Sequence, residues 1–93
     1  MIRYTVVWDN DVESAFAEEW LKGDSSRRSL LTEFADKVDS LLSADPESKG
    51  MSIPESLRVL AIPLSESTIR SSVAYRIERQ DRLVRVVRLN ISR

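Results

Sequence analysis

The chain has no cysteine and no histidine among its 93 residues. Their absence excludes disulfide bridges, thiol nucleophiles, Ser-His-Asp catalysis and zinc sites built from Cys and His ligands. No apolar run approaches the roughly 20 residues that a membrane-spanning helix needs. Residues 1–4 lack the pattern that opens a secretory signal. We therefore expect a cytoplasmic protein with no membrane segment.

Glycine and proline are also scarce, with two and three residues respectively, so their positions mark the few strong breaks in the chain. Hydrophobic residues make up 42% of the chain and charged residues 31%, which is typical of a folded protein. A chain of this length buries roughly 60–70% of its unfolded surface, enough for one modest core. We assign residues 1–93 to a single domain.

Charge is unevenly divided along the chain, although the net charge is only −1. Residues 1–56 hold 6 Lys and Arg against 12 Asp and Glu, a net charge of −6. Residues 57–93 hold 8 Arg and 3 acids, a net charge of +5. The asymmetry is compatible with an anionic partner for the basic part, and equally with two oppositely charged parts that attract each other.

The N-terminal pattern predicts a strand followed by a helix. Apolar and β-branched residues alternate over residues 2–8, which is typical of a strand. Asn10 with Glu13 resembles a capping box at a helix start. Helical spacing of apolar residues then predicts a helix over residues 11–21, which ends at Gly23.

A second helix follows after a short connection. Asp24 or Ser25 can cap it, and it ends before Pro46 because the residue before proline avoids helical geometry. Glu33 and Lys37 form a favourable i, i+4 pair on its outer face. Its core-facing stripe consists of Leu30, Leu31, Phe34, Ala35, Val38, Leu41 and Leu42.

The C-terminal half predicts a loop and three strands. Residues 44–56 read as loop because of their Pro and Gly content. Strands are predicted over residues 57–62, 73–78 and 83–91, with a polar connection over residues 63–68. The last strand carries apolar residues on both faces, which predicts a central position in the sheet. Its two faces are expected to carry Val84 with Val86, and Leu83 with Val87, Leu89 and Ile91.

Grouped helices followed by grouped strands favour the α+β class. We predict the order β-α-α-β-β-β, in which an antiparallel two-helix hairpin packs on one face of a four-stranded, mainly antiparallel sheet. The first strand is expected to join the sheet in parallel beside the last.

Several local patterns resemble the RelE/ParE toxin superfamily, and together they span nearly the whole chain. They are Tyr4-Thr5-Val6-Val7-Trp8, Leu41-Leu42 with Asp45-Pro46, Gly50, Leu57-Arg58-Val59-Leu60, Ala74-Tyr75-Arg76-Ile77 and Leu83-Val84-Arg85-Val86-Val87. The resemblance implies the toxin of a type II toxin–antitoxin system, held inactive by a cognate antitoxin protein. RelE-like members cut mRNA at the ribosome without a metal or another cofactor, whereas ParE-like members bind DNA gyrase.

The resemblance also implies a set of basic residues that stabilise charge at the cleaved phosphate. Carried over to this chain, the catalytic set is Arg58, Arg70, Arg76 and Arg93. The set is incomplete: Leu60 stands where a second cation is common, Ser72 stands three residues before Tyr75, and no tyrosine follows Arg93. The resemblance therefore leaves open an endoribonuclease, a gyrase-binding toxin, and a RelE-fold protein that only binds a partner.

The arginines of the C-terminal half are the candidate binding residues. We expect Arg58, Arg76 and Arg93 to line one sheet face together with the nucleic-acid-binding candidates Arg85 and Arg88, since arginine suits bidentate phosphate contacts. The alternative is that they decorate solvent-facing strand positions and discourage aggregation. Tyr75 is expected in the core with its hydroxyl satisfied. The remaining expected core aromatics are Trp8, Phe16, Trp20 and Phe34.

Overall fold

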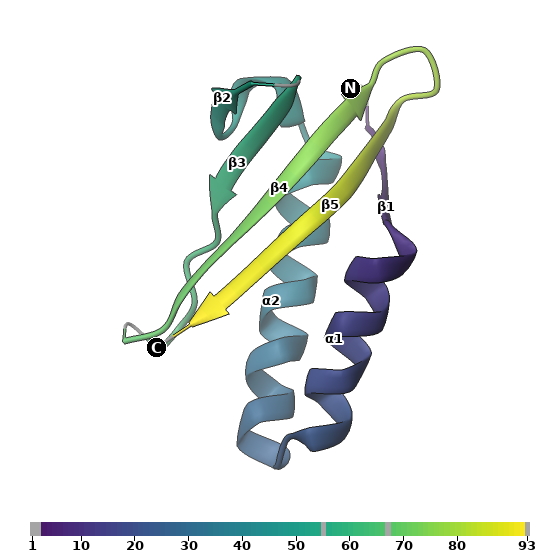
Figure 1. The fold of residues 1–93 in the computed structure, drawn as a ribbon. Coiled ribbons are helices and arrows are strands. Elements are labelled where there is room, and N and C mark those ends of the chain that lie inside the picture. Colours follow the sequence, from purple (N-terminus) through teal and green to yellow (C-terminus); the bar gives the residue numbers. More distant parts are fainter. Residues whose placement is uncertain (1–2, 55, 67, 93) are drawn as a thin grey trace.

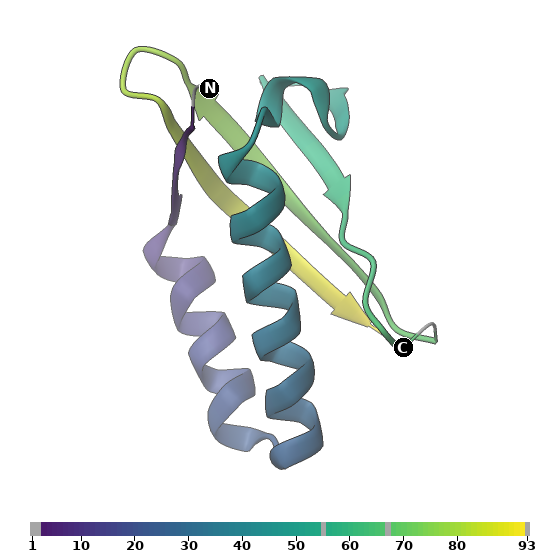
Figure 2. The ribbon, with the colours of Figure 1, turned by 180° about the vertical axis from the view of Figure 1, so that it is seen from behind.

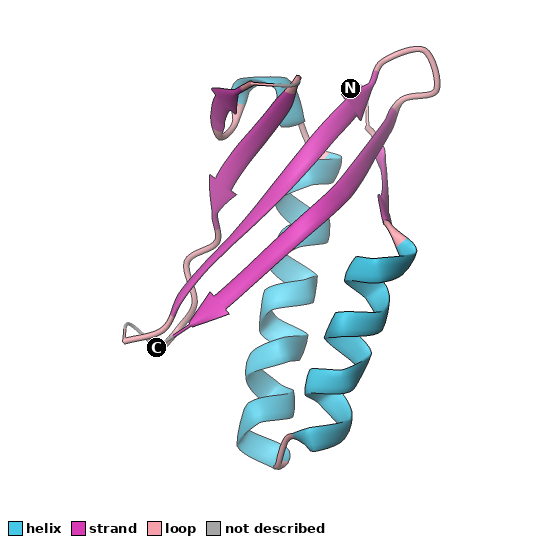
Figure 3. Ribbon diagram, in the orientation of Figure 1, coloured by secondary structure: helices cyan, strands magenta, loops and turns pink. Residues whose placement is uncertain are grey.

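The computed structural model describes residues 3–54, 56–66 and 68–92. Its elements are β1 (Thr5–Trp8), α1 (Asn10–Lys22), α2 (Ser25–Ser43), the short 3-10 helix η1 (Pro46–Ser48), β2 (Met51–Ile53), β3 (Leu57–Ala61), β4 (Arg70–Glu78) and β5 (Leu83–Ser92). Apart from β1, the helices precede the strands along the chain. Figure 3 shows the two long helices behind the strands. The predicted α+β class is confirmed.

The strands form one mixed sheet in the order β1-β5-β4-β3-β2. β1 pairs with β5 in parallel, as predicted, and the other pairs are antiparallel. The sheet has five strands rather than the predicted four, because Met51–Ile53 pairs with the start of β3. Three residues between Gly50 and Pro54 are too few to carry a periodic signal, so the pairing partner alone makes this segment a strand.

Both helices lie on one face of the sheet and leave the opposite face bare, which we call the open face (Figures 1 and 2). Asp24 begins α2 as predicted, since its Oδ1 accepts the backbone N–H of Arg27 at 2.9 Å. The predicted capping box of α1 is wrong: Asp9 is the N-cap and makes no side-chain cap, while Asn10 lies inside the helix. No described helix has the length and hydropathy needed to cross a bilayer.

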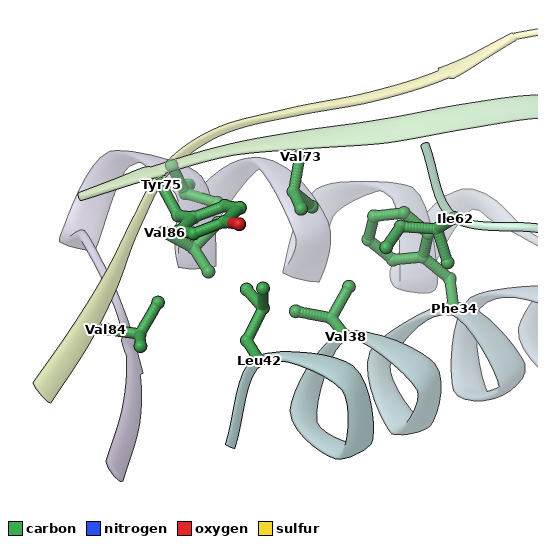
Figure 4. Packing of buried hydrophobic residues seen from close by; sticks show 9 residues of the cluster. Phe34, Val38, Leu42, Ile62, Val73, Tyr75, Val84 and Val86 are labelled. Atoms are coloured by element: carbon green, nitrogen blue, oxygen red, sulfur yellow. The ribbon is translucent and has the colours of Figure 1, made fainter. Parts of the chain in front are cut away.

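The core lies between α2 and the central strands (Figure 4). Phe34, Val38 and Leu42 of α2 are fully buried against Tyr75 of β4 and Val86 of β5. Each buried aliphatic or aromatic side chain of this kind contributes about 1.5–3 kcal/mol. This stripe is the one that the apolar periodicity of α2 predicts.

Three of the four remaining aromatic predictions hold. Phe34 is fully buried, and Trp8 packs edge-on against Phe16 and Phe34 with ring centroids 5.2 and 6.4 Å away. The prediction for Trp20 is wrong, because this residue is 37% exposed. It lies near the hairpin tip that extends beyond the sheet (Figure 1), where the guanidinium of Arg28 covers its ring.

A bulge in β5 changes which side chains face the helices. Val86 pairs with Tyr75, but Arg88 pairs with Ala74, so Val87 is an extra residue. Beyond the bulge, Leu89 and Ile91 return to the helix side, where they pack against the core. The predicted division of β5, with Leu89 and Ile91 opposite Val84 and Val86, is therefore wrong, because alternation alone cannot locate a bulge.

Helix α2 also holds the connection between β3 and β4. Glu33 accepts both the backbone N–H and the hydroxyl of Ser65, at 2.7 and 2.8 Å. Lys37 forms the predicted ion pair with Glu33 at 3.0 Å and donates to the carbonyl of Pro63 at 2.5 Å. These contacts hold the pKa of the Glu33 carboxyl below its ordinary value, chiefly through the Ser65 hydroxyl and then Lys37.

Candidate functional site

The strand register decides which arginines share the open face. Tyr75 is buried toward α2, so by alternation Arg70 and Arg76 of β4 point to the open face. Across the β4/β5 pair, Arg85 lies directly opposite Arg76, and Arg88 lies opposite Ala74. Four of the predicted arginines therefore share this face.

These four arginines differ in their partners. Arg85 contacts Asp9 and Glu78 at 3.3 Å each, and these contacts raise its pKa, with Asp9 the larger cause. Within the described parts of the chain, the guanidinium groups of Arg70, Arg76 and Arg88 make no hydrogen bond or ion pair, and all three residues are exposed. We call these three residues the arginine row.

The arginine row crosses the middle of the sheet. Arg70 and Arg76 are separated by about 20 Å along β4, from the usual rise per residue of a strand. Arg88 lies between them, opposite Ala74. The carboxylates of Asp9 and Glu78 neutralise Arg85 rather than the row, so a net positive strip remains available to an anionic ligand.

An apolar hollow of about 230 Å³ adjoins the row on the open face. Ile53 of β2, Leu57 and Val59 of β3, Ala74 of β4 and Val87 of β5 line it. No aromatic side chain among the described residues points to this face, since Trp8 and Tyr75 of the strands lie on the helix side, Tyr4 before β1 packs against the core, and the others belong to helices. Sequence reasoning missed the hollow because β2, which forms one wall, was not predicted.

Arg58 lies on the other side of the sheet from the row. It pairs with Tyr75, so its side chain points to the helix side. Its Nε donates to the carbonyl of Lys49 at 2.8 Å, and its Nη2 donates to that of Gly50 at 3.3 Å. The prediction that Arg58 and Arg76 converge on one face is wrong. Directly paired residues share a face, so Arg58 lies on the same face as Tyr75. Arg76 directly follows Tyr75 in β4 and therefore points to the opposite face.

Tyr75 is in the core with a satisfied hydroxyl, as predicted. The hydroxyl lies 2.9 Å from the carbonyl oxygen of Pro46 and 2.8 Å from that of Lys49. Burial raises its pKa, with Arg58 acting in the opposite direction. This group therefore serves as a buried hydrogen-bond donor that fastens the segment before β2.

A second hollow, which is polar and has a volume of about 260 Å³, lies on the helix side near η1. Glu47 is its central carboxylate: it forms an ion pair with Arg79 at 2.5 Å and accepts the hydroxyl of Tyr4 at 3.1 Å. These two donors, Arg79 first, hold the pKa of the Glu47 carboxyl below its ordinary value. Here, as in the Arg85–Asp9 pair, the acidic and basic parts of the chain attract each other.

Arg93, the fourth predicted catalytic residue, lies outside the described residues. Of the other five candidates, Arg70, Arg76, Arg85 and Arg88 share the open face. Arg58 alone lies on the helix side.

One solved structure provides the comparison for this fold. It is a double mutant of the E. coli toxin RelE in the free state, with a TM-score of 0.60, 16% sequence identity, and coverage of 95% of this chain and 82% of that chain. The likeness shows that this chain has a RelE-like fold, as its sequence pattern predicted. No family model matches the chain, and no curated protein matches it in sequence.

Proposed function

We propose that this chain is the toxin of a type II toxin–antitoxin pair, and that its open face contacts RNA phosphates through the arginine row. The single observation that carries the proposal is that Arg70, Arg76 and Arg88 share a bare sheet face, with no acidic partner among the described residues. Guanidinium groups bind phosphate oxygens in pairs, and they are favoured where a backbone must be held. The RelE-like fold supports the toxin assignment.

In this proposal, mRNA is cut at the ribosome without a metal. The 2′-hydroxyl of a ribose attacks the neighbouring phosphate, and the bond from phosphorus to the 5′-oxygen of the next nucleotide breaks. The negative charge that builds on the phosphate is stabilised by Arg76 together with Arg88, which lies opposite Ala74. Arg70, about 20 Å from Arg76 along β4, holds the adjoining backbone. Arg58 keeps the segment before β2 in place through the carbonyls of Lys49 and Gly50, and it supports the sheet rather than the phosphate.

Expression in a bacterium tests the proposal. The wild-type chain should stop growth and protein synthesis and leave cut mRNA, which primer extension detects. Single changes of Arg70, Arg76 or Arg88 to Gln should each relieve the arrest. Arg82→Gln is the matched control, because Arg82 lies in the exposed β4–β5 turn and its guanidinium makes no bond in the described chain. Equal arrest by all four variants would reject the arginine row.

The second candidate function is non-catalytic binding, either of DNA gyrase or of another protein partner. Two observations favour it. Glu78, which shares the open face with Arg76, is held by Arg85, so no free acid or base stands beside the row in the described chain. The apolar hollow also lacks an aromatic ring on which a base would stack. Intact mRNA with an SOS response and altered supercoiling would support this candidate and reject RNA cleavage.

The proposed partner common to both candidates is a cognate antitoxin. Co-expression with the product of an adjacent small gene should restore growth and yield a complex that co-purifies with the chain. Restored growth without a complex would argue against direct neutralisation.

A further inference from the structure

A third hollow lies at the end of the sheet where β3 ends, β4 begins and β5 ends (Figure 1). We call it the terminal hollow. Its volume is about 680 Å³, so it is larger than the two hollows described above and falls within the range of small-molecule sites. The proposed function uses only Arg70 of its lining, and the remaining lining residues have no role there.

Three paired residues cross the floor of the terminal hollow. Ala61 of β3 is paired with Ser72 of β4, and Ser72 is paired with Asn90 of β5. All three lie on the open face, because Arg70 is two residues from Ser72 and points there. Two strand spacings give this row a length of about 10 Å. The side chains of Ala61 and Ser72 are short, so the floor lies low between longer neighbours.

The apolar wall of the terminal hollow is held by hydrogen bonds. The N–H of Ile62 donates to the carbonyl of Ser71 at 2.8 Å, and the hydroxyl of Ser71 donates to the carbonyl of Ile62 at 2.6 Å. Lys37 of α2 donates to the carbonyl of Pro63 at 2.5 Å. A wall that is already ordered lowers the entropic cost of binding a ligand. The apolar lining residues are Ala61, Ile62, Pro63 and Ile69.

The polar groups of the terminal hollow are one cation and two neutral side chains. The guanidinium of Arg70 is exposed and makes no ion pair with a described residue. Arg70 and Asn90 are diagonal neighbours across the β4/β5 pair, a separation that a long side chain spans. No acidic and no aromatic residue lines the hollow within the described chain. The lining therefore favours an anion with an aliphatic body over a cation or a stacked ring.

We infer that the terminal hollow binds a small aliphatic carboxylate, with its head group between Arg70 and Asn90 and its hydrocarbon chain along the row toward Ala61 and Pro63. A carboxylate presents two coplanar oxygens, which match two parallel N–H groups of a guanidinium. A phosphate monoester would bring a second negative charge, and the hollow has no second cation among its described lining residues. The inference does not depend on the proposed toxin activity, although both use Arg70.

Octanoate is the probe, because its extended chain is similar in length to the three-residue row. Titration of the ¹⁵N-labelled chain should move the amide signals of Ser72 and Asn90 along a saturable, single-site curve. Acetate lacks the chain and octan-1-ol lacks the charge, so each should bind at least about tenfold more weakly, or about 1.4 kcal/mol. Tighter binding of octyl phosphate than of octanoate would overturn the carboxylate assignment.

Two pairs of variants test the head group and the floor separately. Arg70→Gln should weaken octanoate by at least about tenfold, whereas Arg76→Gln should change it by less than about twofold. Arg76 is the matched control because it is exposed on the same strand and face but does not line the hollow. Ser72→Phe fills the floor and should also weaken octanoate, whereas Thr5→Phe, at an exposed strand position away from the hollow, should not.

The outcomes separate this inference from the toxin proposal. Absence of saturable shifts, equal binding of octan-1-ol, or equal losses in Arg70→Gln and Arg76→Gln would overturn the inference. A wild-type chain that binds octanoate without arresting growth would reject the toxin activity and leave this site standing. Growth arrest that is lost in Arg76→Gln while octanoate still binds would support both proposals as independent. Thermal unfolding of each variant verifies that it remains folded.

Discussion

The buried hydroxyl of Tyr75 gives the sharpest test of how this fold is held together. Tyr75→Phe keeps the ring packing but removes the only side-chain donor among the described residues that reaches the carbonyl of Pro46. The carbonyl of Lys49 keeps the Nε–H of Arg58 at 2.8 Å. The carbonyl of Pro46 keeps only the backbone N–H of Lys49 at 3.4 Å, a weak bond.

The expected cost follows from those partners. Losing one buried hydrogen bond and leaving a poorly satisfied carbonyl costs about 1–2 kcal/mol. For a domain of this size the melting temperature should fall by about 5–15 °C. Urea unfolding followed by circular dichroism should show a lower midpoint with an unchanged m-value.

Tyr4→Phe is the matched control for this prediction. The hydroxyl of Tyr4 donates to Glu47 in an exposed position, so its loss should change stability by less than about 0.5 kcal/mol. Equal stabilities for Tyr75→Phe and the wild type would refute the view that this hydroxyl fastens the segment before β2. An equal loss in both variants would show that burial is not what distinguishes the two hydroxyls.

Three further changes probe other parts of the fold. Gly50→Ala should cost about 2–4 kcal/mol in urea unfolding, because Gly50 has a φ of 73° and a Cβ there would lie 2.7 Å from the carbonyl oxygen of Val59; a neutral result would contradict this. The lowered pKa of Glu33 contributes stability above its ordinary value of 4.5, and this is lost as pH falls through the folded pKa. Glu33→Gln should therefore flatten the loss of stability between neutral and acid pH in urea titrations, and an unchanged slope would count against it. Leu42→Ala, at a fully buried position, should cost about 2–5 kcal/mol by thermal unfolding, and a cost below 1 kcal/mol would contradict the packing described.

The arginine-rich C-terminal half illustrates the limit of charge counting. The expected attraction between the two parts is confirmed for Arg79 and Arg85, which are paired with acids of the N-terminal part. The arginine row is not paired in the described chain, and an anionic partner for it stays a prediction. Which arginine falls in which group depends on the register of β4 with β5. A count of charges contains no information about strand register. It could therefore predict the uneven division of charge along the chain, but not which arginines form a binding surface.

The amino-acid sequence by itself determined both helices, four of the five strands to within a few residues, the order of these elements, and the parallel placement of β1. These follow from local periodicity and from the short connections, which leave few ways to bury the stripe of α2. The local sequence was also sufficient to predict the helix cap at Asp24 and the burial of Tyr75.

Only the tertiary structure decided that β2 forms one wall of the open-face hollow, that β5 contains a bulge, and on which face Arg58 lies. β2 is a strand because β3 offers it hydrogen bonds, and its three residues carry no strand signal of their own. Because Val87 is an extra residue, every later side chain of β5 lies on the face opposite to the one that plain alternation predicts. Period-two alternation tells which residues share a face within one strand; which faces of two strands coincide is set by their pairing, and that is a property of the folded chain.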